Sequence, residues 1–163
     1  MNNRRGLLAS AVAALLLCSF GLAYAQSKQF YKQHKGQLLV STEPFEASDD
    51  DAALSAQAKK AKGELTATGG SEDSAEWRFH WMAVLNAKPG SANATIFFYD
   101  ITKERKQATY KDIGLDTDGL MVVSDLVITE DDGLKKGNKY ELVLAVEKGG
   151  KQVVLAKGKV TFK

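Results

Sequence analysis

The chain has 163 residues, and its 22 lysines and arginines against 20 acidic residues give a formal net charge of +2. Arg4 and Arg5 lie in a leader-like N-terminus, and without them the count of lysine plus arginine falls from 22 to 20, which balances the charge. Proteins that bind phosphate backbones normally have a clear basic excess, so nucleic acid is excluded as an expected partner.

The N-terminus has the pattern of a secretory signal peptide. Arg4 and Arg5 precede an apolar run over residues 7–22, and Ala23-Tyr24-Ala25 supplies the small-x-small sequence that signal peptidase cleaves. The run is shorter than the roughly 20 residues that span a bilayer, and no basic stop-transfer cluster follows it. We therefore predict a signal peptide over residues 1–25, an exported protein that is periplasmic or secreted, and no membrane span after cleavage.

The same segment indicates the export route and contains the cysteine of the chain. Arg4-Arg5 also partly resembles a twin-arginine signal, but the very apolar stretch and the lack of a cofactor motif favour the general secretory route. Cys18 lacks the small preceding residue that a bacterial lipoprotein signal requires, so lipidation is not expected. Cys18 is also the one cysteine, so the exported chain has to be stabilised by an ordinary core rather than by disulfides.

After the signal peptide, residues 26–36 are polar and are expected to form a tail, followed by a single folded domain over residues 37–163. That domain begins with a short strand at residues 38–40. A helix is then predicted near residues 49–62.

The predicted helix has signals at both ends. Ser48 precedes three aspartates, which suits capping and the positive end of the helix dipole, and lysines precede Gly63 at the other end. Its apolar stripe is narrow and consists of Leu54, Ala58 and Ala61. Such a stripe favours packing on a flat surface.

Seven further segments have the alternation and turn boundaries of strands. They are residues 64–68, 77–85, 95–101, 105–111, 120–128, 139–147 and 151–162. Glycine-containing and proline-containing turns separate them, including Gly69-Gly70-Ser71 and Gly149-Gly150. Because parallel crossovers would need several helices, we expect an all-β sandwich with one helix appended.

The last two segments predict a hairpin around Gly149-Gly150. If Lys148 pairs with Lys151, Val146 faces Val153 and Leu144 faces Leu155. The apolar residues stand at odd-numbered positions up to Leu155 but at even-numbered positions at Val160 and Phe162. This change predicts a one-residue bulge near Gly158.

Leu134 and Tyr140, six residues apart just before this hairpin, resemble the tyrosine corner of immunoglobulin-like and fibronectin type III domains. The resemblance covers roughly the last 30 residues, with Trp81 in the place of the buried strand tryptophan. It implies an antiparallel immunoglobulin-like β-sandwich of about seven to eight strands. The one short helix expected after the first strand departs from the family pattern. The chain is also similar to secreted bacterial β-sandwich proteins, and neither resemblance implies an activity.

Catalytic chemistry has little support in the residues. His34 and His80 are too few for a zinc site or a hydrolase triad, and no Gly-x-Ser-x-Gly motif is present. The acidic residues cluster in turns, and Asp116-Thr117-Asp118-Gly119 lacks the remaining ligands of a calcium loop. We therefore expect no enzyme, no catalytic residue, no metal site and no cofactor.

One sheet is predicted to be apolar on both faces. Trp77, Phe79 and Trp81, with Ala83 and Leu85, indicate a core face, and Ile96 and Phe98 point inward while Phe97 and Tyr99 point outward. The hairpin adds outward residues, so the candidate binding face consists of Phe97, Tyr99, Val143 and Val154. Either the predicted helix or an external partner covers this face, and the narrow helix stripe favours the helix.

Two roles stay open. The first is a periplasmic or secreted binding or adaptor module for an envelope protein or a glycan. The second is a structural component of the cell envelope without a small ligand. The sequence leaves the oligomeric state undetermined.

Overall fold

The computed structural model describes residues 28–71, 74–116 and 118–163, so the predicted signal peptide lies outside the described residues. The protein is mainly β, with two sheets. The elements in chain order are α1 (Lys28–His34), β1 (Leu38–Ser41), α2 (Asp51–Ala58), β2 (Glu64–Leu65), β3 (Gly69–Ser71), β4 (Ser74–Val84), β5 (Asn93–Asp100), β6 (Lys106–Gly114), β7 (Met121–Thr129), η1 (Glu130–Asp132), β8 (Lys139–Lys148) and β9 (Lys151–Phe162).

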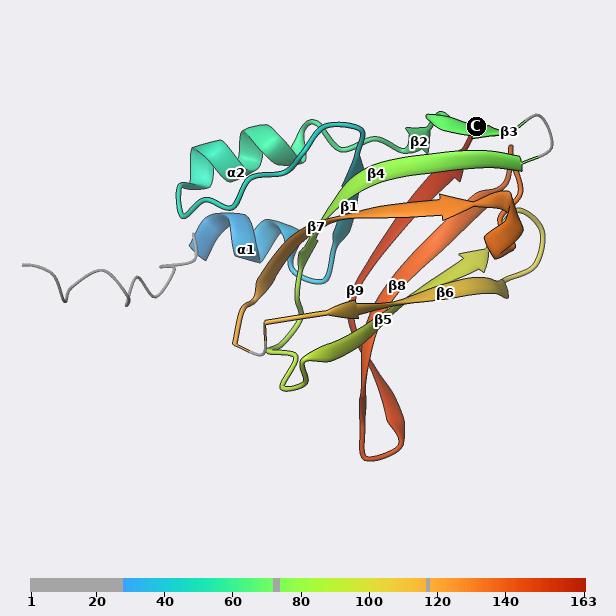
Figure 1. Ribbon diagram of the computed structural model, residues 1–163. Helices are drawn as coiled ribbons and strands as arrows, with labels where there is room; N and C mark the ends of the chain where they lie inside the picture. Colours follow the sequence, from blue (N-terminus) through green and yellow to red (C-terminus); the bar gives the residue numbers. More distant parts are fainter. Residues whose placement is uncertain (1–27, 72–73, 117) are drawn as a thin grey trace, which may run out of the picture.

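The two sheets form the layers of a β-sandwich (Figure 1). In the first sheet, β1, β3 and β7 all pair with β4 and run antiparallel to it. The second sheet has the order β2-β9-β8-β5-β6, antiparallel except for the short parallel pair of β2 and β9. The predicted β-sandwich is confirmed, including a short helix after the first strand.

The main core lies between the two sheets, and alternation along β4 supplies its largest side chains. Trp77, Phe79 and Trp81 point into this layer and are almost completely buried, as predicted. Phe162 of β9 lies among them, with ring centroids 5.1 Å from Trp77 and 5.9 Å from Phe79. Burying rings of this size contributes a large part of the hydrophobic stabilisation.

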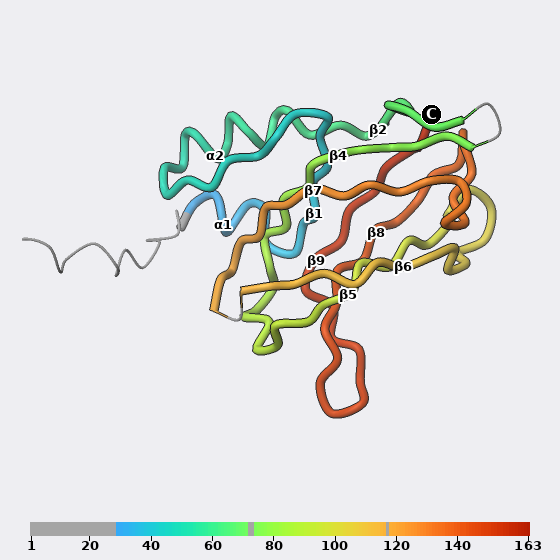
Figure 2. The backbone as a smooth tube through the Cα atoms, in the orientation of Figure 1, coloured from blue at the N-terminus to red at the C-terminus, as the bar shows by residue number. Residues whose placement is uncertain are grey.

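A second, smaller core lies on the opposite face of the first sheet, under the two helices (Figure 2). Met82 and Val84 alternate with the inward residues of β4 and pack against Phe30 and Leu54. Phe30 comes from α1, so part of the expected polar tail is a packed helix. The mostly polar sequence of α1 did not indicate a packed helix, because a seven-residue helix needs few apolar residues to bury one face.

Two hydrogen bonds position α1, one to α2 and one to the residue after β4. The backbone N–H of Phe30 donates to the Asp51 carboxylate at 2.8 Å, and the Tyr31 hydroxyl donates to the Leu85 carbonyl at 2.8 Å. The packed structure therefore includes residues before 37, because α1 is part of it.

The second helix is shorter than predicted and is capped differently. Asp50, rather than Ser48, is the N-cap, and its carboxylate accepts hydrogen bonds from the N–H groups of Ala52 and Ala53. The helix ends at Ala58 because the chain then turns toward β1, where the Lys62 N–H donates to the Val40 carbonyl at 2.8 Å. Gly63 therefore does not terminate the helix.

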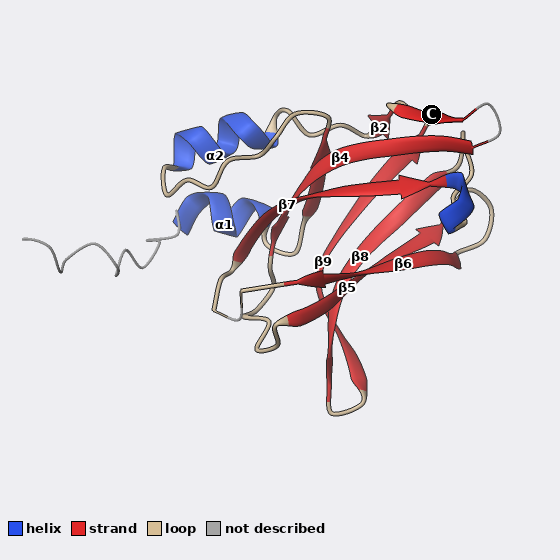
Figure 3. Cartoon of the chain, in the orientation of Figure 1, coloured by secondary structure: helices blue, strands red, loops and turns tan. Residues whose placement is uncertain are grey.

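Figure 3 shows the long hairpin of β8 and β9. It has the predicted register at its tip, but its bulge lies in a different place. Lys148 pairs with Lys151 and Val146 with Val153, but Leu144 pairs with Ala156 rather than with Leu155. The prediction of a bulge near Gly158 is wrong. The extra residue is Leu155, where the alternation of inward and outward side chains changes, and Leu155 and Ala156 are both fully buried.

Another difference concerns Gly69-Gly70-Ser71, which pairs with β4 as the short strand β3 instead of forming a turn. The number of strands is therefore nine among the described residues, against the seven to eight expected.

A hydrogen bond to a side chain holds the corner that precedes β8. The Lys135 N–H donates to the Tyr140 hydroxyl at 2.8 Å, and both Leu134 and Tyr140 are buried. Burial raises the pKa of the Tyr140 hydroxyl above its ordinary value. The tyrosine thus fastens the loop before β8 to the core.

No helix in the described part of the chain is long and apolar enough to cross a bilayer.

Candidate functional site

The four residues of the predicted binding face lie on one surface, the outer face of the second sheet. Phe97 on β5 pairs with Val143 on β8, and Tyr99 lies two residues further along the same face. Val154 on β9 pairs with Ala145, the next outward residue of β8. The structure therefore brings all four together.

The helices do not cover this surface. Leu54 of α2 packs on Met82 and Val84, on the outer face of the first sheet. Figure 1 shows α1 and α2 beside β1, β4 and β7, away from β5 and β6. The expectation that α2 covers Phe97 and Tyr99 is therefore wrong. Phe30 and Phe45 pack with α2 on the outer face of the first sheet and form the second core there.

Val143 does not reach the surface, since its side chain is 2% exposed. It lies on the central strand β8 between Phe97 and Lys157, which pair with it from either side. These longer side chains and their neighbours account for its burial. Val143 supports the face, and Val154 is half-buried at its margin.

A row of three aromatic rings crosses the surface: Tyr110 of β6, then Phe97 and Tyr99 of β5. The ring centroids of Tyr110 and Phe97 are 6.3 Å apart, and those of Phe97 and Tyr99 are also 6.3 Å apart. Tyr110 is 55% exposed, whereas the other two rings are half-buried. We name these three residues the aromatic row.

Sequence reasoning did not include Tyr110. The residue lies inside a predicted strand, but the register that pairs it with Phe97 is a property of the folded sheet. A search for aromatic residues on the adjacent predicted strand would have proposed it, without showing which face it occupies.

An ion pair closes one end of the aromatic row. The Arg105 guanidinium lies 3.5 Å from the centroid of the Tyr99 ring, and its Nε donates to the Glu141 carboxylate at 2.8 Å. The hydrogen bond to Glu141 raises the pKa of Arg105 further above its already high value. Arg105 therefore covers one face of Tyr99 and stays charged at every physiological pH.

The two flanks of the row are polar. Toward one side the Thr95 hydroxyl donates to the Asp112 carboxylate at 2.7 Å. Toward the other, Lys157 and Lys159 occupy the outer face of β9, opposite Val143 and Glu141. Neither lysine makes an ion pair within the described residues.

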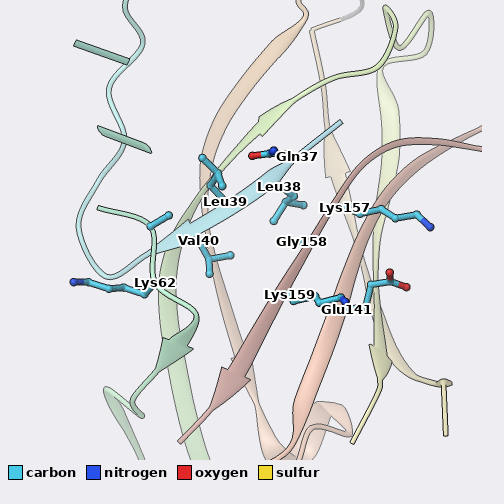
Figure 4. A pocket seen from close by; sticks show the side chains of 10 residues that line it. Gln37, Leu38, Leu39, Val40, Lys62, Glu141, Lys157, Gly158 and Lys159 are labelled. Atoms are coloured by element: carbon cyan, nitrogen blue, oxygen red, sulfur yellow. The ribbon is translucent and has the colours of Figure 1, made fainter. Parts of the chain in front are cut away.

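Beside these lysines is a pocket of about 340 Å³, where β1 passes the edge of β9 (Figure 4). Its lining residues come from both sheets and from the segment after α2. They are Gln37, Leu38, Leu39, Val40, Ala61, Lys62, Glu141, Lys157, Gly158 and Lys159. Glu141 belongs to this lining and also holds Arg105, so the pocket and the aromatic row are adjacent.

The two histidines lie apart from this surface. His80 is on β4, on the face that carries Met82, and the His34 ring contacts Gln37 at 2.9 Å. Within residues 28–71, 74–116 and 118–163, no three His, Cys, Asp or Glu side chains form a group able to hold a metal ion. The outer face of the second sheet thus offers stacking, hydrogen bonding and charge.

No family model matches the chain, and the comparison with curated proteins also found no match. Among solved structures, the chain is similar to two glycosyl hydrolase family 2 members from Bacteroides cellulosilyticus, both at 12% identity, with TM-scores of 0.38 and 0.36. These alignments cover 58% and 59% of this chain and 12% and 14% of theirs.

A third similar structure is a β-glucosidase from Listeria innocua in complex with gluconolactone, at 7% identity and a TM-score of 0.32. It aligns over 62% of this chain and 14% of its own. The chain therefore spans only 12% to 14% of the length of these three solved structures.

Proposed function

We propose that this protein is an exported, non-enzymatic β-sandwich module that binds a glycan chain through the aromatic row. The proposal of export rests on the signal-peptide pattern of residues 1–25. The observation that carries the binding proposal is the row itself, Tyr110, Phe97 and Tyr99, on a sheet face that the helices leave open.

The chemistry of a sugar ring matches this row. A pyranose has apolar C–H faces, which pack on aromatic rings, and a hydroxyl-bearing edge, which needs hydrogen-bond partners. The rings supply the first. The exposed Asp112 carboxylate and the remaining N–H groups of the half-exposed Arg105, on the borders of the row, supply an acceptor and donors for the second.

A protein partner fits less well. A stable protein interface buries about 800 Å² on each side around an apolar centre. On this face, Tyr110 is the one large apolar side chain among the described residues that is mostly exposed. A patch of three rings, bordered by charges, suits a sugar chain better than a broad protein surface.

We also interpret the fold as an immunoglobulin-like sandwich. The hydrogen bond from the Lys135 N–H to the Tyr140 hydroxyl supports this, because it has the form of a tyrosine corner. The absence of enzymatic activity is likewise proposed. It is supported by the location of His34 and His80 away from the aromatic row.

The test is a binding assay on the exported chain, from residue 26 onward, with insoluble cellulose, chitin, peptidoglycan sacculi and immobilised polygalacturonate. We expect at least one of these to retain the protein. Tyr110→Ala should weaken binding about threefold to tenfold, because it removes one stacking ring. Tyr110→Phe keeps the ring and should bind as the natural protein does.

Val153→Ala is the matched control, since Val153 is the other exposed large hydrophobic residue of the described chain and lies on the hairpin of β8 and β9. Equal weakening by Val153→Ala and Tyr110→Ala would contradict the site. Retention by none of the four polysaccharides would contradict the function. Concentration-dependent self-association in that case would favour the structural envelope role.

A further inference from the structure

The surface between the aromatic row and the adjacent pocket carries uncompensated positive charge. Lys157 and Lys159 lie two residues apart on the same face of β9, which separates their Cα atoms by about 7 Å. No described carboxylate forms an ion pair with either of them. A ligand that reaches this surface therefore meets two free ammonium groups.

The carboxylate that lies across the strands from Lys159 is already engaged. Glu141 pairs with Lys159 across the strands, but its oxygen accepts the Arg105 hydrogen bond at 2.8 Å, and its side chain is only 16% exposed. Arg105 and Glu141 thus neutralise each other. The charge left over between row and pocket is that of Lys157 and Lys159.

The directions of the side chains separate these lysines from a third one. In Figure 4, Lys157, Lys159 and Glu141 project to one side of β9, while Lys62 projects to the opposite side of the pocket. Lys62 therefore does not contribute to the same charge. The two β9 lysines share their face with Phe97 and Tyr99, as the strand register requires.

We infer that the glycan bound by the aromatic row is acidic, with a sugar carboxylate held between Lys157 and Lys159 while neighbouring rings stack on Phe97 and Tyr110. This inference rests on the proposed function. Each exposed ion pair contributes modestly, and salt screens it. Two such pairs beside a stacking surface are enough to select a uronic-acid chain over a neutral one.

The experiment compares oligogalacturonate with its carboxyl methyl ester, by titration calorimetry on the exported chain. The ester keeps the sugar rings and removes the charge. We expect esterification to weaken binding about fivefold to tenfold, and added salt to weaken binding of the acid form alone. Lys157→Gln with Lys159→Gln should lower affinity for the acid form to that for the ester.

Lys148→Gln with Lys151→Gln is the matched control, because it removes the same formal charge at the exposed hairpin tip. Equal affinities for acid and ester overturn the inference and leave glycan binding intact. Binding to cellulose or chitin, but to neither form of oligogalacturonate, does the same. Binding to no polysaccharide at all overturns the proposed function together with the inference.

Discussion

Gly158 occupies a position where the chain has no room for a side chain. A Cβ built there would lie 2.0 Å from the Leu38 carbonyl oxygen, because β1 passes directly over β9 at this residue. The obstacle is backbone, which cannot rotate away. The glycine therefore allows the two sheets to approach at the edge that borders the pocket.

Gly158→Ala should lower the free energy of unfolding by about 3 kcal/mol, as overpacking against an immovable atom does. Gly114→Ala is the control, since a Cβ at Gly114 meets nothing within 4 Å. That variant should stay within about 0.5 kcal/mol of the natural protein. Urea denaturation of both measures this, and equal midpoints would show that β1 can shift at Gly158.

At the scale of elements, the short helix η1 is joined to β6 through Asp132. One carboxylate oxygen accepts a hydrogen bond from the Lys111 ammonium at 2.7 Å, and the other accepts from the Thr129 N–H at 2.9 Å. Desolvation raises the pKa of Asp132, but the hydrogen bonds from Lys111 and Thr129 outweigh it and hold this pKa below its ordinary value.

This shift makes part of the stability depend on pH. Because the folded pKa lies below the unfolded one, the contribution is complete above about pH 4 and is lost as the pH falls through the folded value. Asp132→Asn should cost about 1 kcal/mol at pH 7, a modest amount because the side chain is partly exposed, and less at pH 3. Urea denaturation at both pH values tests this.

Asp131→Asn is the control for that experiment, because Asp131 is exposed and makes no hydrogen bond or ion pair with described residues. It should leave the stability unchanged at both pH values. A cost for Asp132→Asn that is the same at pH 7 and pH 3 would contradict the linkage.

At the scale of the whole molecule, β4 belongs to both cores. Trp77, Phe79 and Trp81 point into the core between the sheets, and Met82 and Val84 point into the core under the helices. Loss of either core exposes one face of the same strand. The helical layer and the sandwich should therefore unfold together.

We expect a single unfolding transition in urea, with tryptophan fluorescence and far-UV circular dichroism changing at the same midpoint. Phe30→Ala, which removes a ring from the second core, should lower both midpoints together and cost about 3 to 5 kcal/mol. Two separate midpoints, or a shift in the dichroism alone, would show that the helices unfold independently.

Much of the fold and part of the site could be predicted from the sequence. Alternation along each strand separates the inward residues Trp77, Phe79 and Trp81 from the outward ones, and the same alternation placed Phe97 and Tyr99 on an outer face. The hairpin register near Gly149-Gly150 was also predicted, because a two-residue turn determines the pairs beside it.

Contacts between segments far apart in the chain required the tertiary structure. Alternation states that a residue faces outward, but it does not state which neighbour lies beside it or what covers the face. The pairing of Phe97 with Tyr110, the packing of α1 and α2 on the first sheet, and the site of the bulge at Leu155 all depend on which surfaces meet. The sequence by itself thus determined the class of fold and the faces of its strands. The tertiary structure decided which face stays open, because a face is buried only when another element packs on it.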